Sequence, residues 1–183
     1  MNNSGNAAIQ RFFLNACLFE ASLLLVAYGL GWIADINPLQ HLEFSESALL
    51  IGFAGTLPLI LLFMALHATT LRSVRVIRNL LMETLASRLY ALHWTDLFVL
   101  SAIAGVAEEV LFRGVIQPWL ETTWSESAAL WLSSVLFGLV HAVTPLYAVL
   151  ATLVSVYLGL SLDYAPMRNL LIPIVIHALY DFF

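Results

Sequence analysis

The chain has 183 residues, of which 61% are hydrophobic and only 10% are charged, and its mean hydropathy is +0.91. A soluble domain has about 45–50% apolar and about 25% charged residues, so this composition excludes a soluble globular protein and predicts a polytopic membrane protein. The formal net charge is −5, lysine is absent, and no basic patch suited to nucleic acid occurs. The lone cysteine, Cys17, excludes an internal disulfide.

Six apolar segments approach the roughly 20 residues that a membrane-spanning helix needs. They cover residues 12–34, 47–70, 96–117, 127–144, 146–162 and 169–183. The first is too long for the apolar region of a signal peptide and is interpreted as a retained span. Its one carboxylate, Glu20, is expected to face a helix interior. The predicted fold is therefore all-α, a transmembrane bundle of about six helices with one additional interfacial helix.

The interfacial helix is predicted between the second and third spans, at residues 73–92, where apolar residues recur at helical spacing. These apolar residues are Val74, Ile77, Leu81, Leu85, Leu89 and Leu92. Four of the seven arginines also fall in this connection: Arg72, Arg75, Arg78 and Arg88. The positive-inside rule then places the connection and both termini in the cytoplasm, with Arg168 as the one arginine that falls on the other side.

Ionisable side chains interrupt three of the predicted spans, and at membrane depth such groups usually mark function. The three clusters are Glu108, Glu109 and Arg113; Phe137 and His141; and His177 and Asp181. Each contains a pair at i, i+4, which lies on one helix face. At a rise of ~1.5 Å per residue, Glu108, His141 and His177 lie ~15, ~21 and ~13 Å from the same side of the membrane. Helix tilt absorbs that difference, so a carboxylate and two imidazoles are expected to converge near mid-membrane.

The two adjacent glutamates are predicted to differ in role. Glu109 and Arg113 are spaced to pair along one helix, whereas Glu108 points ~100° away and lacks such a partner. A carboxylate in that position can act as a general base. Structural interpretations remain open: the Glu109–Arg113 pair could only pin helices together, and His141 could be a packed, hydrogen-bonded histidine.

Glu-Glu-x-x-x-Arg, Phe-x-x-x-His and His-x-x-x-Asp on successive spans resemble the motifs of the CPBP intramembrane proteases. That family includes the type II CAAX prenyl endopeptidases and the abortive-infection and bacteriocin-immunity proteins, and the resemblance covers residues 95–183. It implies that Glu108 activates the hydrolytic water with help from His141. It also implies that His177 and Asp181 stabilise the oxyanion, and that Glu109, Arg113 and Phe137 support the site.

The resemblance leaves the cofactor open, because the family was long described as metalloproteases. Zinc, if bound, would be held by Glu108, His141 and His177. The histidines do not form a His-Glu-x-x-His motif, and a glutamate-activated water without metal is favoured. The prenyl-processing members have Asn where this chain has Asp181, and an ionised Asp can only accept hydrogen bonds. Asp181 is therefore expected to be protonated or to orient His177.

Three parts are expected: two spans at 1–71, the cytoplasmic interfacial helix at 72–94, and, from the resemblance, a four-helix CPBP-like catalytic core at 95–183. The predicted function is hydrolysis of a peptide bond in a membrane-embedded or lipidated substrate, in the plasma membrane of a bacterium. One alternative is a non-catalytic immunity or scaffold protein of the same family. A less favoured alternative is a small proton-coupled transporter, since no inverted repeat is apparent.

Overall fold

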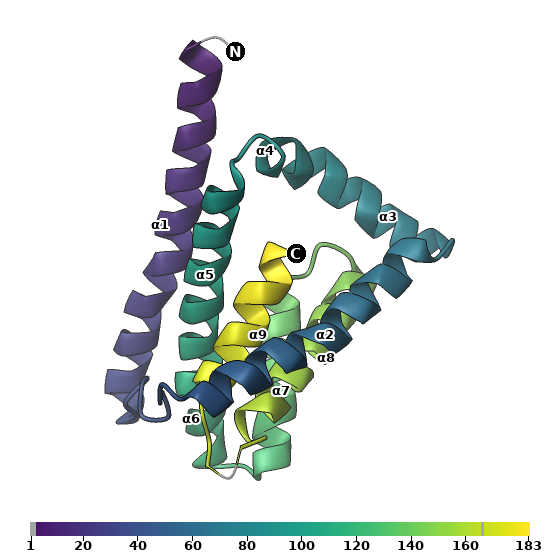
Figure 1. Cartoon of the computed structure of the whole chain (residues 1–183). Coiled ribbons are helices and arrows are strands. Elements are labelled where there is room, and N and C mark those ends of the chain that lie inside the picture. The colour runs from purple at the N-terminus through teal and green to yellow at the C-terminus, as the bar shows by residue number, and fades with distance from the viewer. Residues whose placement is uncertain (1–2, 166) are drawn as a thin grey trace.

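The computed structural model describes residues 3–165 and 167–183, which form helices and connections without any strand (Figure 1). The helices are α1 (Asn3–Ala34), α2 (Glu46–Ala68), α3 (Arg72–Leu81), α4 (Ser87–Leu89), α5 (Trp94–Leu111), α6 (Gln117–Glu121), α7 (Glu126–Val140), α8 (Pro145–Leu162) and α9 (Leu171–Phe182), with π-helical segments η1 (Met82–Ala86) and η2 (Phe112–Ile116). The all-α membrane architecture predicted from the sequence is therefore confirmed.

Length and apolar composition indicate which of the described helices can cross a membrane. Among the described residues, three helices are long and apolar enough: Ala7–Ala34, α2 and α8. The apolar helices α7 and α9 are shorter, with 15 and 12 residues, or ~22 and ~18 Å. The predicted third span is built from α5, η2 and α6, which continue one another and contain the charged cluster. Every predicted span is thus helical, but the spans differ in length.

Polar side chains at the helix starts explain several of these boundaries. Ser45, Ser125 and Thr144 accept hydrogen bonds from backbone N–H groups in the first turns of α2, α7 and α8. His93 begins α5 with a reciprocal capping box to Asp96. Each contact satisfies a donor that the first turn of a helix leaves free. The Thr144 cap also forms the tight turn that was predicted between the fourth and fifth spans.

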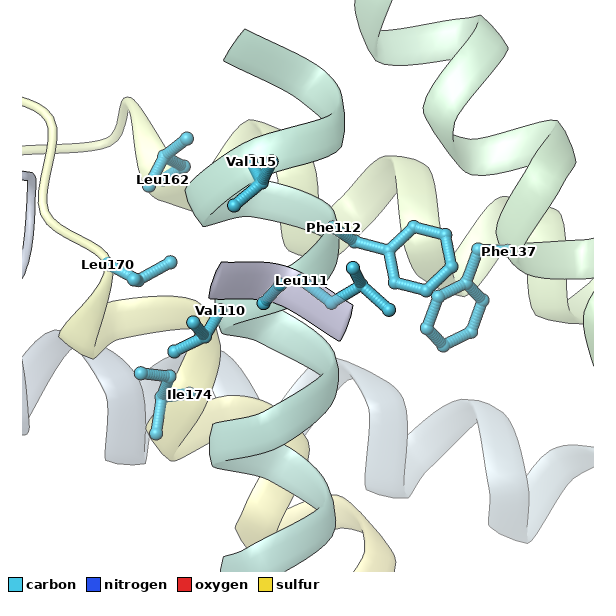
Figure 2. Packing of buried hydrophobic residues seen from close by; sticks show 9 residues of the cluster. Val110, Leu111, Phe112, Val115, Phe137, Leu162, Leu170 and Ile174 are labelled. Atoms are coloured by element: carbon cyan, nitrogen blue, oxygen red, sulfur yellow. The ribbon is translucent and has the colours of Figure 1, made fainter. Parts of the chain in front are cut away.

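Helix α5 lies at the centre of the packing, with α1 and α9 against it, while α2 packs on α9 and α7 on α8 (Figure 1). Figure 2 shows the core where α5 runs into η2. Side chains from α5, η2, α7, α8 and α9 meet there, and the rings of Phe112 and Phe137 lie edge to face at 5.0 Å. This dense region holds α5, η2 and α7 in fixed orientations next to the polar clusters.

The segment α3–η1–α4 leaves the bundle as an arm that connects the end of α2 to the start of α5 (Figure 1). Ile77 is its only buried side chain among those that are described, and its arginines Arg72, Arg75 and Arg88 are exposed. A continuous helical segment with this exposure fits the amphipathic interfacial helix predicted at residues 73–92.

At the opposite end of the bundle, Arg168 is held by two carboxylates. It forms ion pairs with Glu121 at 2.6 Å and with Asp163 at 2.7 Å. The hydrogen bonds to Glu121, followed by those to Asp163, raise the pKa of Arg168 above its usual value against the effect of burial. Arg168 therefore connects the ends of α6 and α8 and stays the one arginine opposed to the orientation inferred from the arginine cluster.

Close approach of α5 and α9 depends on Gly105. A Cβ atom built there would lie 2.8 Å from the backbone nitrogen of Ala178 and 2.9 Å from its Cα. Gly105→Ala is therefore expected to force the two helices apart and to lower the free energy of unfolding by about 1–3 kcal/mol. Thermal unfolding in detergent micelles measures this effect.

Gly29→Ala in α1 is the matched control, because a Cβ at that position meets nothing within 4 Å. Alanine is the better helix former, so this control is expected to be neutral or slightly stabilising. Equal destabilisation by both substitutions would contradict the importance of the α5–α9 contact.

Candidate active site

The two adjacent glutamates of α5 have different surroundings, as their spacing predicted. Glu109 is completely buried, and its Oε1 accepts hydrogen bonds from Nη1 of Arg113 at 3.0 Å and from Nδ1 of His177 at 2.7 Å. Glu108 is 8% exposed and faces the histidine of the second cluster instead. Each glutamate thus contacts a different histidine.

This pairing differs in one respect from the depth-based expectation, in which Glu108 meets both His141 and His177. The contact of His177 is with Glu109, one residue further along α5. The rotation of α9 against α5 decides which glutamate His177 reaches, and that rotation follows from side-chain packing rather than from depth.

Arg113 lies in the π-helical segment η2 and is 1% exposed. Besides Glu109, it donates from Nη2 to Oγ of Ser155 at 2.9 Å and to the backbone carbonyl of the same residue in α8. A single guanidinium therefore connects α5 and η2 to α8, while Glu109 extends the network to α9. Single π-helical turns inside α-helices occur frequently at functional sites.

His141 lies just past the last residue of α7, with its ring held in one orientation. Its Nδ1 donates a hydrogen bond to the backbone carbonyl of Phe137 at 2.8 Å, because a carbonyl oxygen can only accept. Its Nε2 is then directed toward Oε2 of Glu108, 3.4 Å away. That carboxylate oxygen is buried and has no hydrogen-bond partner among the described residues. The pair therefore presents two groups that can accept hydrogen bonds.

Phe137 lies at the centre of these groups. Its ring stacks on the imidazole of His141, with centroids 4.2 Å apart and planes 20° apart. The ring edge approaches His177 at 6.0 Å, and the guanidinium carbon of Arg113 lies 5.4 Å from the ring centroid. Phe137 thus separates the Glu108–His141 pair from the buried Glu109–Arg113 network while it contacts members of both.

The third cluster lies along α9. His177 is 6% exposed, and its Nε2 lies 3.5 Å from Oδ2 of Asp181, whose side chain is 36% exposed. Since Nδ1 of the same ring contacts Glu109, the imidazole is flanked by a carboxylate on each side.

A cavity of about 1780 Å³ joins these residues to the interfacial arm. Its lining includes Glu108, His141, His177 and Asp181, together with Tyr147 of α8 and Glu20 of α1. Residues of α2 and of the α3–η1–α4 arm border the rest. The structure therefore brings members of the three polar clusters together around one cavity, whose other lining residues are mostly apolar.

Three lining or supporting residues were not identified as site residues from the sequence: Glu20, Tyr147 and Ser155. Glu20 was expected to face a helix interior, and it lines the cavity that the helices enclose. A single carboxylate inside an apolar span was the available signal for it. Tyr147 and Ser155 carry no such signal, because tyrosine and serine are common in membrane helices.

The donor set does not fit the zinc alternative at Glu108, His141 and His177. Both ring nitrogens of His177 are directed at carboxylates other than Glu108. Within residues 3–165 and 167–183, no group of three His, Cys, Asp or Glu side chains is placed to hold a metal ion. A tetrahedral zinc site needs three or four ligands at about 2.0–2.3 Å from one point.

Comparison with known proteins gave one match. A family model described as "Type II CAAX prenyl endopeptidase Rce1-like" matches residues 91–183, just over half of the chain. The matched region begins before α5 and contains all three polar clusters. No curated protein and no solved structure matched the chain.

Proposed function

Since the chain belongs to the type II CAAX prenyl endopeptidase Rce1-like family, a family of proteases, we propose that it is an intramembrane endopeptidase whose Glu108 activates water. The observation that carries this proposal is the buried, unpartnered Oε2 of Glu108, which lies 3.4 Å from Nε2 of His141 on the cavity wall. Buried polar atoms are nearly always hydrogen-bonded, so a free one in a cavity suits a ligand or a reacting water.

The hydrolytic step follows from what each atom can accept. Oε2 of Glu108 and Nε2 of His141 both accept hydrogen bonds, so they suit one water molecule as their common donor. Glu108 removes a proton as the water oxygen bonds to the carbonyl carbon of the substrate, and the carbonyl electron pair moves to its oxygen. The same proton then passes to the amide nitrogen, the C–N bond breaks, and the products are a carboxylic acid and an amine.

Stabilisation of the oxyanion is assigned to His177. Because Nδ1 donates to Glu109, Nε2 can donate to an oxyanion only when the ring is an imidazolium and the Nε2–H group turns to the substrate from Oδ2 of Asp181, 3.5 Å away. Glu109 and Asp181 supply the negative charge that this form needs. A preorganised charged donor in a cavity shielded from water is worth more than one in solution. Asp181 is therefore proposed to orient and charge-balance His177 rather than to contact the oxyanion.

The shape of the cavity supports a lipidated or membrane-anchored substrate. Apolar side chains of α1, α2 and the interfacial arm line the same cavity as members of the three polar clusters. A peptide with an attached apolar chain could place that chain among the former and its peptide bond beside the latter. We further propose a bacterial plasma-membrane location with both termini in the cytoplasm, on the strength of the arginine distribution.

Cleavage of a defined peptide tests this proposal. The purified protein in lipid bicelles is expected to hydrolyse a farnesylated peptide with a Cys-aliphatic-aliphatic-Ser end, as followed by mass spectrometry. Activity should survive incubation with a strong chelator, and elemental analysis should find no stoichiometric zinc. Stoichiometric zinc together with chelator-sensitive activity would replace the metal-free mechanism by a metal-dependent one.

The scaffold alternative makes the opposite prediction. A protein that protects its host only by binding a partner would keep its cellular phenotype in Glu108→Ala. A peptidase would lose that phenotype, because it depends on the carboxylate. The intact set of two histidines and Glu108 around one cavity supports the enzyme.

Phe137→Leu is expected to reduce the cleavage rate about 10-fold or more while the substrate KM changes less, because misplacement of a catalytic group costs rate. Leucine fills much of the volume but removes the ring that stacks on His141 at 4.2 Å. Steady-state kinetics with the farnesylated peptide measure the two constants. Val140→Leu, at an exposed position of α7, is the control. An unchanged rate in Phe137→Leu would mean that the backbone hydrogen bond alone orients His141.

A further inference from the structure

Glu20 comes from a part of the chain outside the matched region, yet it lines the same cavity as the proposed catalytic groups. It lies within electrostatic range of Glu108, Asp181, His141 and His177. Helix α1 packs along α5, which carries Glu108. The N-terminal span therefore contributes a third carboxylate to the lining of the cavity, whereas the other two, Glu108 and Asp181, come from the last four spans.

Glu20 has no visible structural reason to be there. Its Oε2 is buried and without a hydrogen-bond partner, and no ion pair to this side chain occurs among the described residues. Within the predicted span of residues 12–34, Glu20 lies eight residues from the nearer end, or ~12 Å along the helix, which places it inside the hydrocarbon region of the membrane. A buried acceptor without a partner is destabilising, so its retention calls for a compensating contact.

We propose that Glu20 is a substrate-positioning residue, whose free carboxyl oxygen accepts a hydrogen bond from an N–H group of the peptide bound in the cavity. This inference rests on the proposed peptidase function. The cavity has a volume of about 1780 Å³, and its lining includes Glu20 of α1 together with Glu108 of α5 and Tyr147 of α8. Glu108 and His141 would act on the carbonyl side of the peptide bond, while Glu20 would fix the peptide through its N–H.

The N–H donor has two possible sources: a backbone amide or the charged end of a basic side chain. Glutamine at position 20 distinguishes them, because its amide oxygen still accepts from a backbone N–H but carries no charge for a cation. Leucine removes the acceptor in either case. Ser22→Leu is the matched control, since it places the same leucine two residues further along α1 at an exposed position.

Binding is measured without turnover in the Glu108→Gln background. The probe is a fluorescein-labelled, farnesylated peptide with a Cys-aliphatic-aliphatic-Ser end, titrated in lipid nanodiscs by fluorescence anisotropy. Glu20→Leu is expected to raise Kd about 3- to 10-fold, as loss of one hydrogen bond does, and Ser22→Leu to leave it unchanged. A series of peptides, each N-methylated at one amide, identifies the donor. One of them is expected to bind the protein that has Glu20 more weakly than the unmethylated peptide does, and to bind Glu20→Leu as well as the unmethylated peptide does.

The outcomes separate this inference from the proposed function. If Glu20→Gln binds as the parent does, the donor is a backbone amide; if it binds as weakly as Glu20→Leu, and only to peptides containing lysine, the donor is a basic side chain. Tight binding that Glu20→Leu does not weaken overturns the role of Glu20 and leaves the peptidase proposal intact. Absence of binding to the Glu108→Gln protein, with Glu20 intact, overturns the proposed substrate class and the inference with it.

Discussion

Glu108→Gln is expected to lower the rate of peptide cleavage by about 10²–10⁴-fold, the contribution typical of a general base. Glutamine is close to glutamate in shape, so it keeps the volume of the side chain. It removes the basic oxygen that faces Nε2 of His141. Single-turnover cleavage of the farnesylated peptide measures the loss, and thermal unfolding verifies that the variant is folded.

His141→Ala should reduce cleavage as well, because it removes the second acceptor for the water and leaves the Phe137 carbonyl without its hydrogen bond. Glu126→Gln is the control of matching chemistry, since Glu126 occupies the first turn of α7 at an exposed position. Cleavage at the parental rate by folded Glu108→Gln would remove Glu108 from the reaction. In that event another carboxylate of the cavity would have to supply the base.

Arg113→Leu is expected to lower the free energy of unfolding by about 3–5 kcal/mol, the cost of breaking a buried ion pair from one side. Arg113 is 1% exposed, and its removal leaves Glu109 without its cation and Ser155 without its donor. The position of His177 depends on the same Oε1 atom of Glu109, so cleavage should fall too. Unfolding in graded mixtures of mild detergent and SDS measures the stability.

Two further variants test whether the loss of stability comes from the buried ion pair. Arg72→Leu removes an exposed arginine from the interfacial arm and is expected to change stability by less than about 0.5 kcal/mol. Adding Glu109→Leu to Arg113→Leu should recover part of the lost stability, because it removes the unpaired buried charge. The double variant should stay inactive. If the single variant Arg113→Leu were as stable as Arg72→Leu, the buried network of Arg113, Glu109 and Ser155 would not contribute to the stability of the fold.

The sequence alone predicted much of this fold because its pattern depends on local properties. Apolar length identified the spans, and the helical recurrence of Val74, Ile77 and Leu81 identified the interfacial arm. The i, i+4 spacing of Glu109 and Arg113 predicted their ion pair, which the structure contains at 3.0 Å. Such features need no knowledge of how helices pack against one another.

The remainder of the site depends on packing between helices. Gly105 lets Ala178 approach so closely that His177, one residue before it, meets Glu109 and not Glu108. Glu20 enters the cavity because α1 packs along α5, and no spacing in the sequence links these two helices. Ser155 contacts Arg113 through a carbonyl and a hydroxyl group that resemble many others in α8. These contacts depend on how each helix is rotated about its own axis, and that rotation is determined by packing in three dimensions.

The shortness of α7 has a consequence for how the reaction obtains its water. Its 15 residues rise ~22 Å, whereas the hydrocarbon core of a bilayer is about 30 Å thick. The helix ends at Val140, so His141, which lines the cavity, lies short of a full crossing of the bilayer. Lipids beside a short apolar helix thin to match it, which draws the aqueous surface inward. The local thickness of the bilayer thus controls how easily water reaches the site. The rate of peptide cleavage is expected to fall in thicker membranes, because water is a reactant.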